Sequence, residues 1–198
     1  MGNLNIGDVS KVIVGPVKLM TAPKGTSLPA FTGDTITWPS GWVNPGYTED
    51  GLTMGYQPTV VEVLVDEEPS PIYELLDKEK ATVAAKMSQG TLDNLKLAIS
   101  GGTLSVTAAG VGQVALQRLD VGGGTLQEVM VGFEGLSPAG FWRVMVAYRA
   151  NVKANLALAF KRTGKMIIPV EFDLLSDSTK DPGKRLFAYV DKTGPATS

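Results

Sequence analysis

The stretch that decides the fold is WRVMVAYRANV, residues 142–152. Apolar side chains recur there at every second position, which is the period of a β-strand. One expected face carries Trp142, Val144, Val146, Tyr148, Ala150 and Val152. The opposite face carries Arg143, Arg149, Asn151 and Lys153, together with Met145 and Ala147. The pattern predicts a long strand whose first face lies against a core.

The same alternation extends outward from this stretch in both directions. Residues 166–174 place Met166, Ile168, Val170, Phe172 and Leu174 on one face, and residues 59–65 alternate in the same way. Shorter candidate strands are 11–21, 81–88, 113–119, 126–134, 154–160 and 185–190. So many strands need a β-sandwich or a half-barrel to bury their apolar faces, so the fold class is expected to be mainly β.

One segment, residues 91–100, has helical spacing instead. Leu92, Leu95 and Ile99 would share one side of a helix. Thr91 is suited to be its N-cap, and the pair Gly101–Gly102 is suited to end it. We expect a single short helix that depends on packing against the sheet.

Two loops and a tail are expected between and after these elements. The first loop, residues 22–50, is long and rich in proline and glycine, and it carries four aromatic residues: Phe31, Trp38, Trp42 and Tyr47. These side chains either fold back onto the sheet or dock into a neighbouring subunit, which makes them candidate interface residues. The second loop, residues 66–80, could hold a helical turn at 72–76. Residues 192–198 are expected to form a flexible C-terminal tail, and residues 1–198 a single domain.

The composition argues against catalysis and metal binding by this chain. It has 198 residues, a net charge of −2, and neither cysteine nor histidine. Mechanisms that use a Ser-His-Asp or Cys-His arrangement are therefore closed, as are thiolate metal sites. Glu171 and Asp173 share a strand face and could form an acid–base pair, but a wet strand face looks the same. We expect no enzyme, no cofactor and no metal.

Charge and hydropathy also limit the partners. A chain so close to neutral has no basic surface with which to hold nucleic acid. The N-terminus shows no secretion signal, and no apolar stretch approaches the ~20 residues that span a bilayer. No membrane partner is therefore expected.

Four stretches resemble the siphophage major tail protein family. They are VGPVKL with APKGT at 14–26, GWVNPGYTEDGL at 41–52, the strand and helix at 82–97, and the paired strands at 141–152 and 165–175. Each motif is loose, and their order and spacing carry the likeness. Inner tubes of contractile tails and type VI secretion tubes are related architectures.

The resemblance implies a tail tube subunit. Six copies would close into a ring in which the inner strands form one continuous β-barrel, and stacked rings would make the channel for genome delivery. The implied partners are other copies of the chain, the tail tip or baseplate, the tape measure and terminator proteins, and double-stranded DNA in transit. The implied location is the virion tail, assembled in the cytoplasm of the host bacterium.

Two other interpretations of the residues remain open. The chain could be a different virion protein, such as a tail terminator, neck or decoration protein, which would form one ring or sit singly. It could also be a β-sandwich module that binds carbohydrate or protein, with Trp38, Trp42 and Tyr47 as a stacking platform for sugars.

Overall fold

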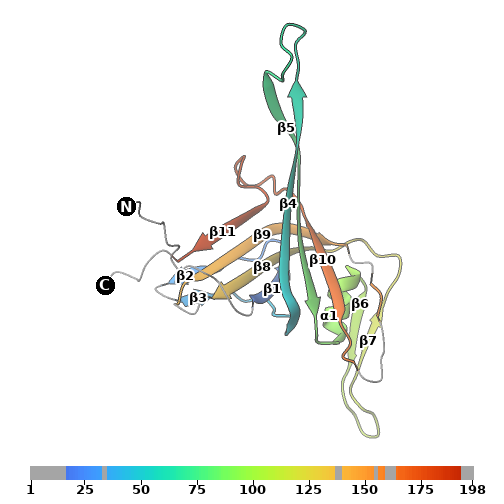
Figure 1. Cartoon of the computed structure of the whole chain (residues 1–198). Helices are drawn as coiled ribbons and strands as arrows, with labels where there is room; N and C mark the ends of the chain where they lie inside the picture. The colour runs from blue at the N-terminus through green and yellow to red at the C-terminus, as the bar shows by residue number, and fades with distance from the viewer. Residues whose placement is uncertain (1–16, 33–34, 137–139, 154–155, 159–163, 193–198) are drawn as a thin grey trace.

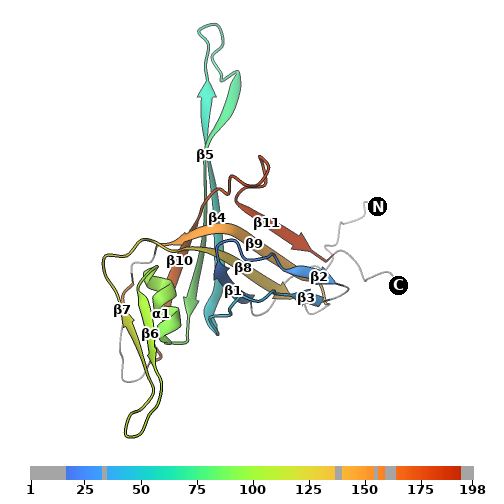
Figure 2. The same cartoon turned by 180° about the vertical axis from the view of Figure 1, so that it is seen from behind.

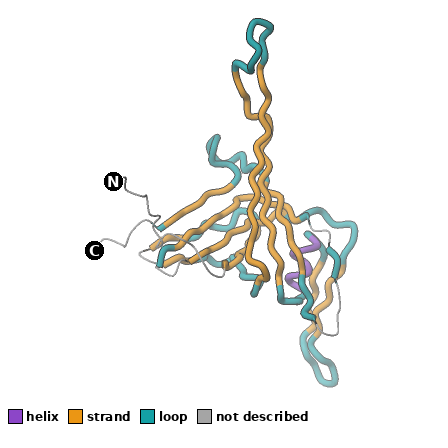
Figure 3. Tube along the Cα trace, viewed as in Figure 1, coloured by secondary structure: helices purple, strands orange, loops and turns teal. Residues whose placement is uncertain are grey.

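The structure is a computed structural model, and it describes residues 17–32, 35–136, 140–153, 156–158 and 164–192. It is mainly β with one short helix (Figures 1 and 3). The strands are β1 Val17–Pro23, β2 Ala30–Thr32, β3 Thr35–Thr37, β4 Thr48–Val63, β5 Tyr73–Met87, β6 Thr103–Thr107, β7 Leu116–Asp120, β8 Glu128–Leu136, β9 Trp142–Val152, β10 Ile168–Leu174 and β11 Phe187–Asp191. The helix is α1 Leu92–Ile99.

The main sheet is antiparallel and has the order β1-β8-β9-β10-β5-β4. It forks at β9. The last part of β9 pairs with β10, from Ala150 to Val152, whereas the first part pairs with β11, from Arg143 to Ala147. The fork lets the sheet fold into two layers, one containing β1, β8, β9 and β11 and the other containing β10, β5 and β4 (Figure 1). The expected mainly β class with one short helix is confirmed; among the described strands the sheet does not close into a barrel.

The main core lies between these two layers. It contains Leu19 of β1, Val131 of β8, Val83 of β5 and Phe172 of β10, none of which is more than 1% exposed. Helix α1 closes the core from the side, with Ala98 buried and with Leu95 and Leu97 packed against it. An eight-residue helix is marginal alone in water, so this packing is what holds it.

A second core covers the outer face of β1, β8 and β9. Its buried members are Met20, Ala22, Trp42, Met130, Trp142, Val144 and Val146. The small β2–β3 hairpin and the segment after it lie over this face and supply Ile36 and Trp38 (Figure 2). Strand β9 is therefore buried on both sides, which explains why apolar residues occupy consecutive positions from Val144 to Ala147.

The β4–β5 hairpin runs far beyond the rest of the molecule (Figures 1 and 2). Its strands remain paired from Thr48 opposite Met87 to Val63 opposite Tyr73. Residues of β5 alternate between buried and accessible from Ala81 onward, but all those from Tyr73 to Lys80 are exposed. We call residues 57–80, which lie beyond the Tyr56–Ala81 pair, the arm.

The helix forms where the sequence predicts it, and its start is confirmed. The Thr91 hydroxyl accepts a hydrogen bond from the Asn94 backbone N–H at 3.2 Å, as an N-cap does. The end differs slightly from the expectation. Ser100, with φ 57°, takes the left-handed position that was expected of the glycine pair.

Three expectations about loops and strands need correction. The predicted loop 22–50 is not one continuous loop. It contains the β2–β3 hairpin, and its residue Val43 forms a β-bridge with Thr21. The predicted helical turn at 72–76 is wrong, because β5 begins at Tyr73. In the predicted strand 154–160, the described residues 156–158 are not in a strand, and the others lie outside the described residues, as do the first residues and nearly all of the tail 192–198.

Candidate assembly surface

The arm exposes large apolar side chains. Seven of its residues have exposed fractions between 49% and 63%: Val60, Val61, Leu64, Ile72, Tyr73, Leu75 and Leu76. A two-stranded hairpin standing alone in water is marginally stable, and an exposed apolar surface of this kind marks an interaction site. The arm is therefore the part of the described molecule that most requires a partner.

The arm is also strongly acidic. Residues 57–80 contain seven Asp or Glu residues and two lysines, for a net charge of −5. Because the whole chain has a net charge of −2, the remaining residues carry +3. The arm and the rest of the chain therefore have net charges of opposite sign, which favours contact between the arm of one copy and the body of another at low salt.

Strand β4 offers a second unsatisfied feature. It ends the order of the main sheet, so its outer edge has no strand partner among the described residues. Such an edge presents backbone N–H and C=O groups that can pair with a strand from another chain. The edge is 16 residues long, from Thr48 to Val63, which is long for an unprotected strand.

Three of the four aromatic residues that the sequence singles out fold back onto their own subunit. The Trp38 indole N–H donates to Glu134 Oε2 at 2.9 Å, and its ring meets that of Trp42 edge-on at 4.7 Å. Trp42 is 8% exposed and donates its indole N–H to the Ser27 carbonyl at 2.8 Å. Phe31 stacks on Trp142 with ring centroids 5.2 Å apart, although 40% of it stays exposed.

Tyr47 is the exception, because 79% of it is exposed. The two tryptophans and Tyr47 therefore do not form a common exposed platform for sugar stacking. Of the four candidates, Tyr47 is exposed enough to contact another subunit, and Phe31 is partly exposed.

Sequence reasoning missed the arm. Residues 72–76 space Ile72, Tyr73, Leu75 and Leu76 so that a helical turn and a strand are both compatible with them. The usable signal was the length of the β4 pattern, which continues past residue 63 and needs a partner strand of equal length.

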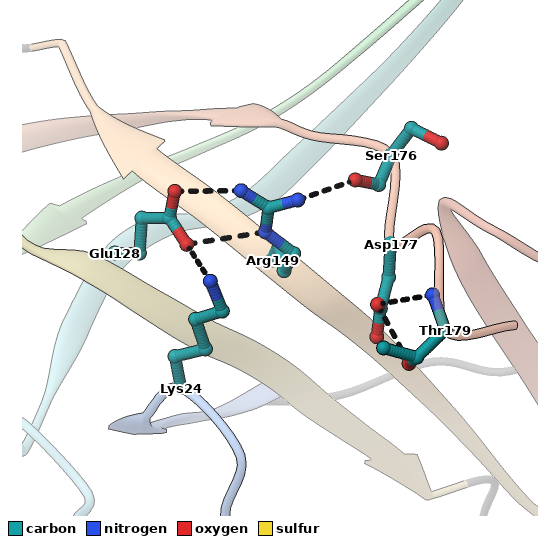
Figure 4. Close-up of polar contacts among 6 residues, drawn as sticks. All are labelled: Lys24, Glu128, Arg149, Ser176, Asp177 and Thr179. Carbon is teal, nitrogen blue, oxygen red and sulfur yellow. Dashed lines mark hydrogen bonds and ion pairs between the residues drawn. The ribbon is translucent and has the colours of Figure 1, made fainter.

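An ion-pair cluster ties the loops around β9 together (Figure 4). The Arg149 guanidinium donates to Glu128 through Nη2 at 2.7 Å and Nε at 3.1 Å, and Lys24 Nζ lies 2.6 Å from the same carboxylate. Arg149 also donates to the Ser176 carbonyl at 2.8 Å. The hydrogen bonds from Arg149 and Lys24 lower the pKa of Glu128 from 4.5 to about 2. Next to it, hydrogen bonds from Thr179 lower the pKa of Asp177.

The described residues bear on metal binding and on membrane crossing by helices. No cluster of three or more His, Cys, Asp or Glu side chains suited to hold a metal ion occurs among them. In the described part of the chain, no helical segment has the length and apolarity needed to span a bilayer.

Comparison with known proteins identifies a family for the chain. A family model described as phage tail tube protein matches residues 7–197, nearly the whole chain. No curated protein matches. The match extends across both layers of the sheet, the helix and the arm. The chain therefore belongs to the phage tail tube protein family and is a structural subunit of the virion tail.

Proposed function

We propose that copies of this chain close into six-membered rings and that the arm joins each ring to the next, so that stacked rings form the tube. The observation that carries this proposal is the arm, an ordered hairpin with seven exposed large apolar residues. Water alone does not favour such a surface, and a neighbouring copy with a net positive body would cover it.

The open edge of β4 before the arm, residues 48–56, supports the closure of the ring. A strand edge is satisfied when it pairs with a strand from the next subunit, and a closed ring leaves no free edge. A contact from the arm of one copy to the body of the next joins two different surfaces and is heterologous, and heterologous contacts that do not close produce filaments. The two features together give rings in one plane and growth along the perpendicular axis.

The same assembly gives the remaining partners. The tube encloses a channel through which double-stranded DNA leaves the capsid. The other proposed partners are the tail tip or baseplate, the tape measure protein and the tail terminator, and assembly takes place in the host cytoplasm. Tyr47 and Phe31 are the aromatic residues that we propose for contacts between subunits, because they retain exposed surface.

A shortened arm tests this proposal. Thr59 and Lys78 are directly opposed in the hairpin, so residues 60–77 can be replaced by Asn-Gly, a two-residue turn that suits an antiparallel pair. A second variant keeps the arm but replaces the opposed pair by V61T and L75T. Electron microscopy of the concentrated proteins, alone and with tail-tip complexes, compares each with the native chain.

The native chain is expected to form long tubes, and the shortened variant single rings or unassembled subunits with an unchanged unfolding transition. Normal tubes from the shortened variant would overturn the role of the arm. Single rings from the native chain would favour a terminator or neck protein instead.

A further inference from the structure

Strands β10 and β5 have one buried face and one open face. In β10, Ile168, Val170, Phe172 and Leu174 are buried, whereas Pro169, Glu171 and Asp173 between them are not. The adjacent part of β5 alternates in the same manner, with Val83 and Ala85 buried and Thr82, Ala84 and Lys86 accessible. The strand pairing places Pro169, Glu171 and Asp173 opposite Lys86, Ala84 and Thr82, so the accessible residues share one face.

Strand β4 continues this open face. Thr53 lies opposite Ala84, Gly55 opposite Thr82 and Glu49 opposite Lys86. The members are Glu49, Thr53, Gly55, Thr82, Ala84, Lys86, Pro169, Glu171 and Asp173, all of them polar or small, and we call this set the open face. A sheet face without large apolar side chains suits permanent contact with water and not with a protein partner.

Ion pairs neutralise three lysines in and beside the open face, whereas Lys80, which lines a hollow with Glu171 and Asp173, has no ion pair among the described residues. Lys86 Nζ lies 2.6 Å from Asp50, and Lys165 Nζ lies 3.3 Å from Glu49. Lys153 pairs with Asp173, and the carboxylates of Asp173 and, more weakly, Glu171 raise the pKa of Lys153. With Lys80, four lysines stand against four carboxylates (Glu49, Asp50, Glu171 and Asp173), so this surface has no net charge.

The position of the bulk of the subunit decides which way this face points in a ring. Helix α1, the main core and the layer of β1, β8, β9 and β11 all lie on the other side of the β10-β5-β4 layer. If that side faced inward, the cores and helices of every copy would fill the centre of the ring. From this arrangement we infer that the open face of β4, β5 and β10 lines the channel of the tube and meets the phosphates of double-stranded DNA.

The chemistry of the open face suits passage. Protein binds DNA mainly by placing Lys or Arg against phosphates and releasing counterions, and unpaired cations would therefore hold the genome. Here the carboxylates lie beside the lysines, so DNA would meet a polar surface without net charge. This inference rests on the proposed ring and adds to it the identity of the lining residues.

The absence of cysteine allows a direct test by thiol labelling. The variant T53C places one thiol on the open face, and T107C places one on β6, which packs with α1 on the opposite side of the layer. Each variant is labelled, before and after tube assembly, with a small maleimide and with a maleimide carried by a polymer coil wider than double-stranded DNA. Unassembled protein gives the reference rate for each thiol.

In tubes, T53C is expected to react with the small maleimide, but its rate with the large maleimide should fall at least tenfold relative to unassembled protein. For T107C, the ratio of the two rates should be the same in tubes as in unassembled protein. Equal reactivity of T53C with both reagents would place the open face outside. Loss of reactivity with both would place it in a subunit contact. Either result overturns the inference while leaving the tube itself intact, whereas failure to form tubes would count against the proposed function.

Discussion

Ala147 and Ala150 of β9 both point into the main core, although they are three positions apart and regular alternation would put them on opposite faces. Their partners in β8 are Val131 and Val129, only two residues apart, so β9 carries one extra residue and forms a β-bulge. Before the bulge the odd-numbered residues Met145 and Ala147 face the main core, and after it the even-numbered residues Ala150 and Val152 do. It also directs Arg149 to the ion-pair cluster with Glu128.

Removing the Glu128 carboxylate tests the ion-pair cluster. The variant E128Q loses the charge that Arg149 and Lys24 share, so a lower melting temperature is expected at neutral pH. Because the folded pKa is depressed to about 2 from 4.5, the native cluster stabilises the fold above pH 4.5, and this contribution is lost as the pH falls toward 2.

Thermal unfolding monitored from pH 7 to pH 2 measures the effect. The native chain should lose more stability across the window from pH 4.5 to 2 than E128Q does. D181N is the control, since its carboxylate lies 3.5 Å from Lys184 in an exposed pair. Identical pH profiles for native protein and E128Q would contradict a stabilising cluster.

Gly132 gives Trp38 its place on the sheet. A Cβ atom built at Gly132 would lie 2.6 Å from the Trp38 ring, closer than real contacts allow, and 3.2 Å from the Met145 carbonyl oxygen, which is tight. We expect G132A to destabilise the fold by about 1–3 kcal/mol through overpacking. The control is G124A, where nothing lies within 4 Å of the added atom. Urea unfolding compares them, and an equal midpoint for both variants would show that Trp38 does not pack there.

Trp42 and Tyr47 separate folding from assembly. W42A removes a ring that is 8% exposed and is expected to cost about 3–5 kcal/mol of unfolding free energy. Y47A removes a ring that is 79% exposed and should change that free energy by about 0.5 kcal/mol or less. Y47A is nevertheless expected to lower the extent of tube assembly. Normal assembly by Y47A would remove Tyr47 from the subunit interface.

A charge change on the open face should affect DNA without affecting assembly. E171K adds two positive units per subunit beside Lys153, and we expect tubes of normal length but several-fold slower genome delivery at low salt. Added salt should restore the rate, because screening weakens contacts with phosphate. D120K makes the same charge change on β7 and is the control. Equal delivery rates for the two variants at low salt would count against contact between Glu171 and DNA.

The sequence predicted the fold class, α1 and most strand positions, because local alternation and helix capping report directly on one-sided burial. It did not predict the inward side of β9. Tyr148 was expected beside Ala150 on one face, but a bulge depends on the register with β8, which lies outside any local pattern. The second core added to the difficulty, because it makes both sides of β9 apolar.

The candidate interface residues were also predicted only in part, because their burial depends on contacts far away in the sequence. An aromatic-rich segment must bury its rings, yet sequence cannot say whether its own sheet or a neighbour covers them. Trp38 and Trp42 lie on their own sheet because Gly132 leaves room for Trp38 and the Ser27 carbonyl accepts from Trp42. The arm was not predicted, because the apolar residues of its second strand are spaced in a way that also fits a helical turn.

A reconstruction of the assembled tail by cryo-electron microscopy would show directly what the arm contacts. We expect a helical stack of rings in which residues 57–80 of each subunit, with Leu64 and Leu75, are covered by a subunit of the adjoining ring. Arms that extend into solvent, or rings held together without any contact to the arm, would contradict it.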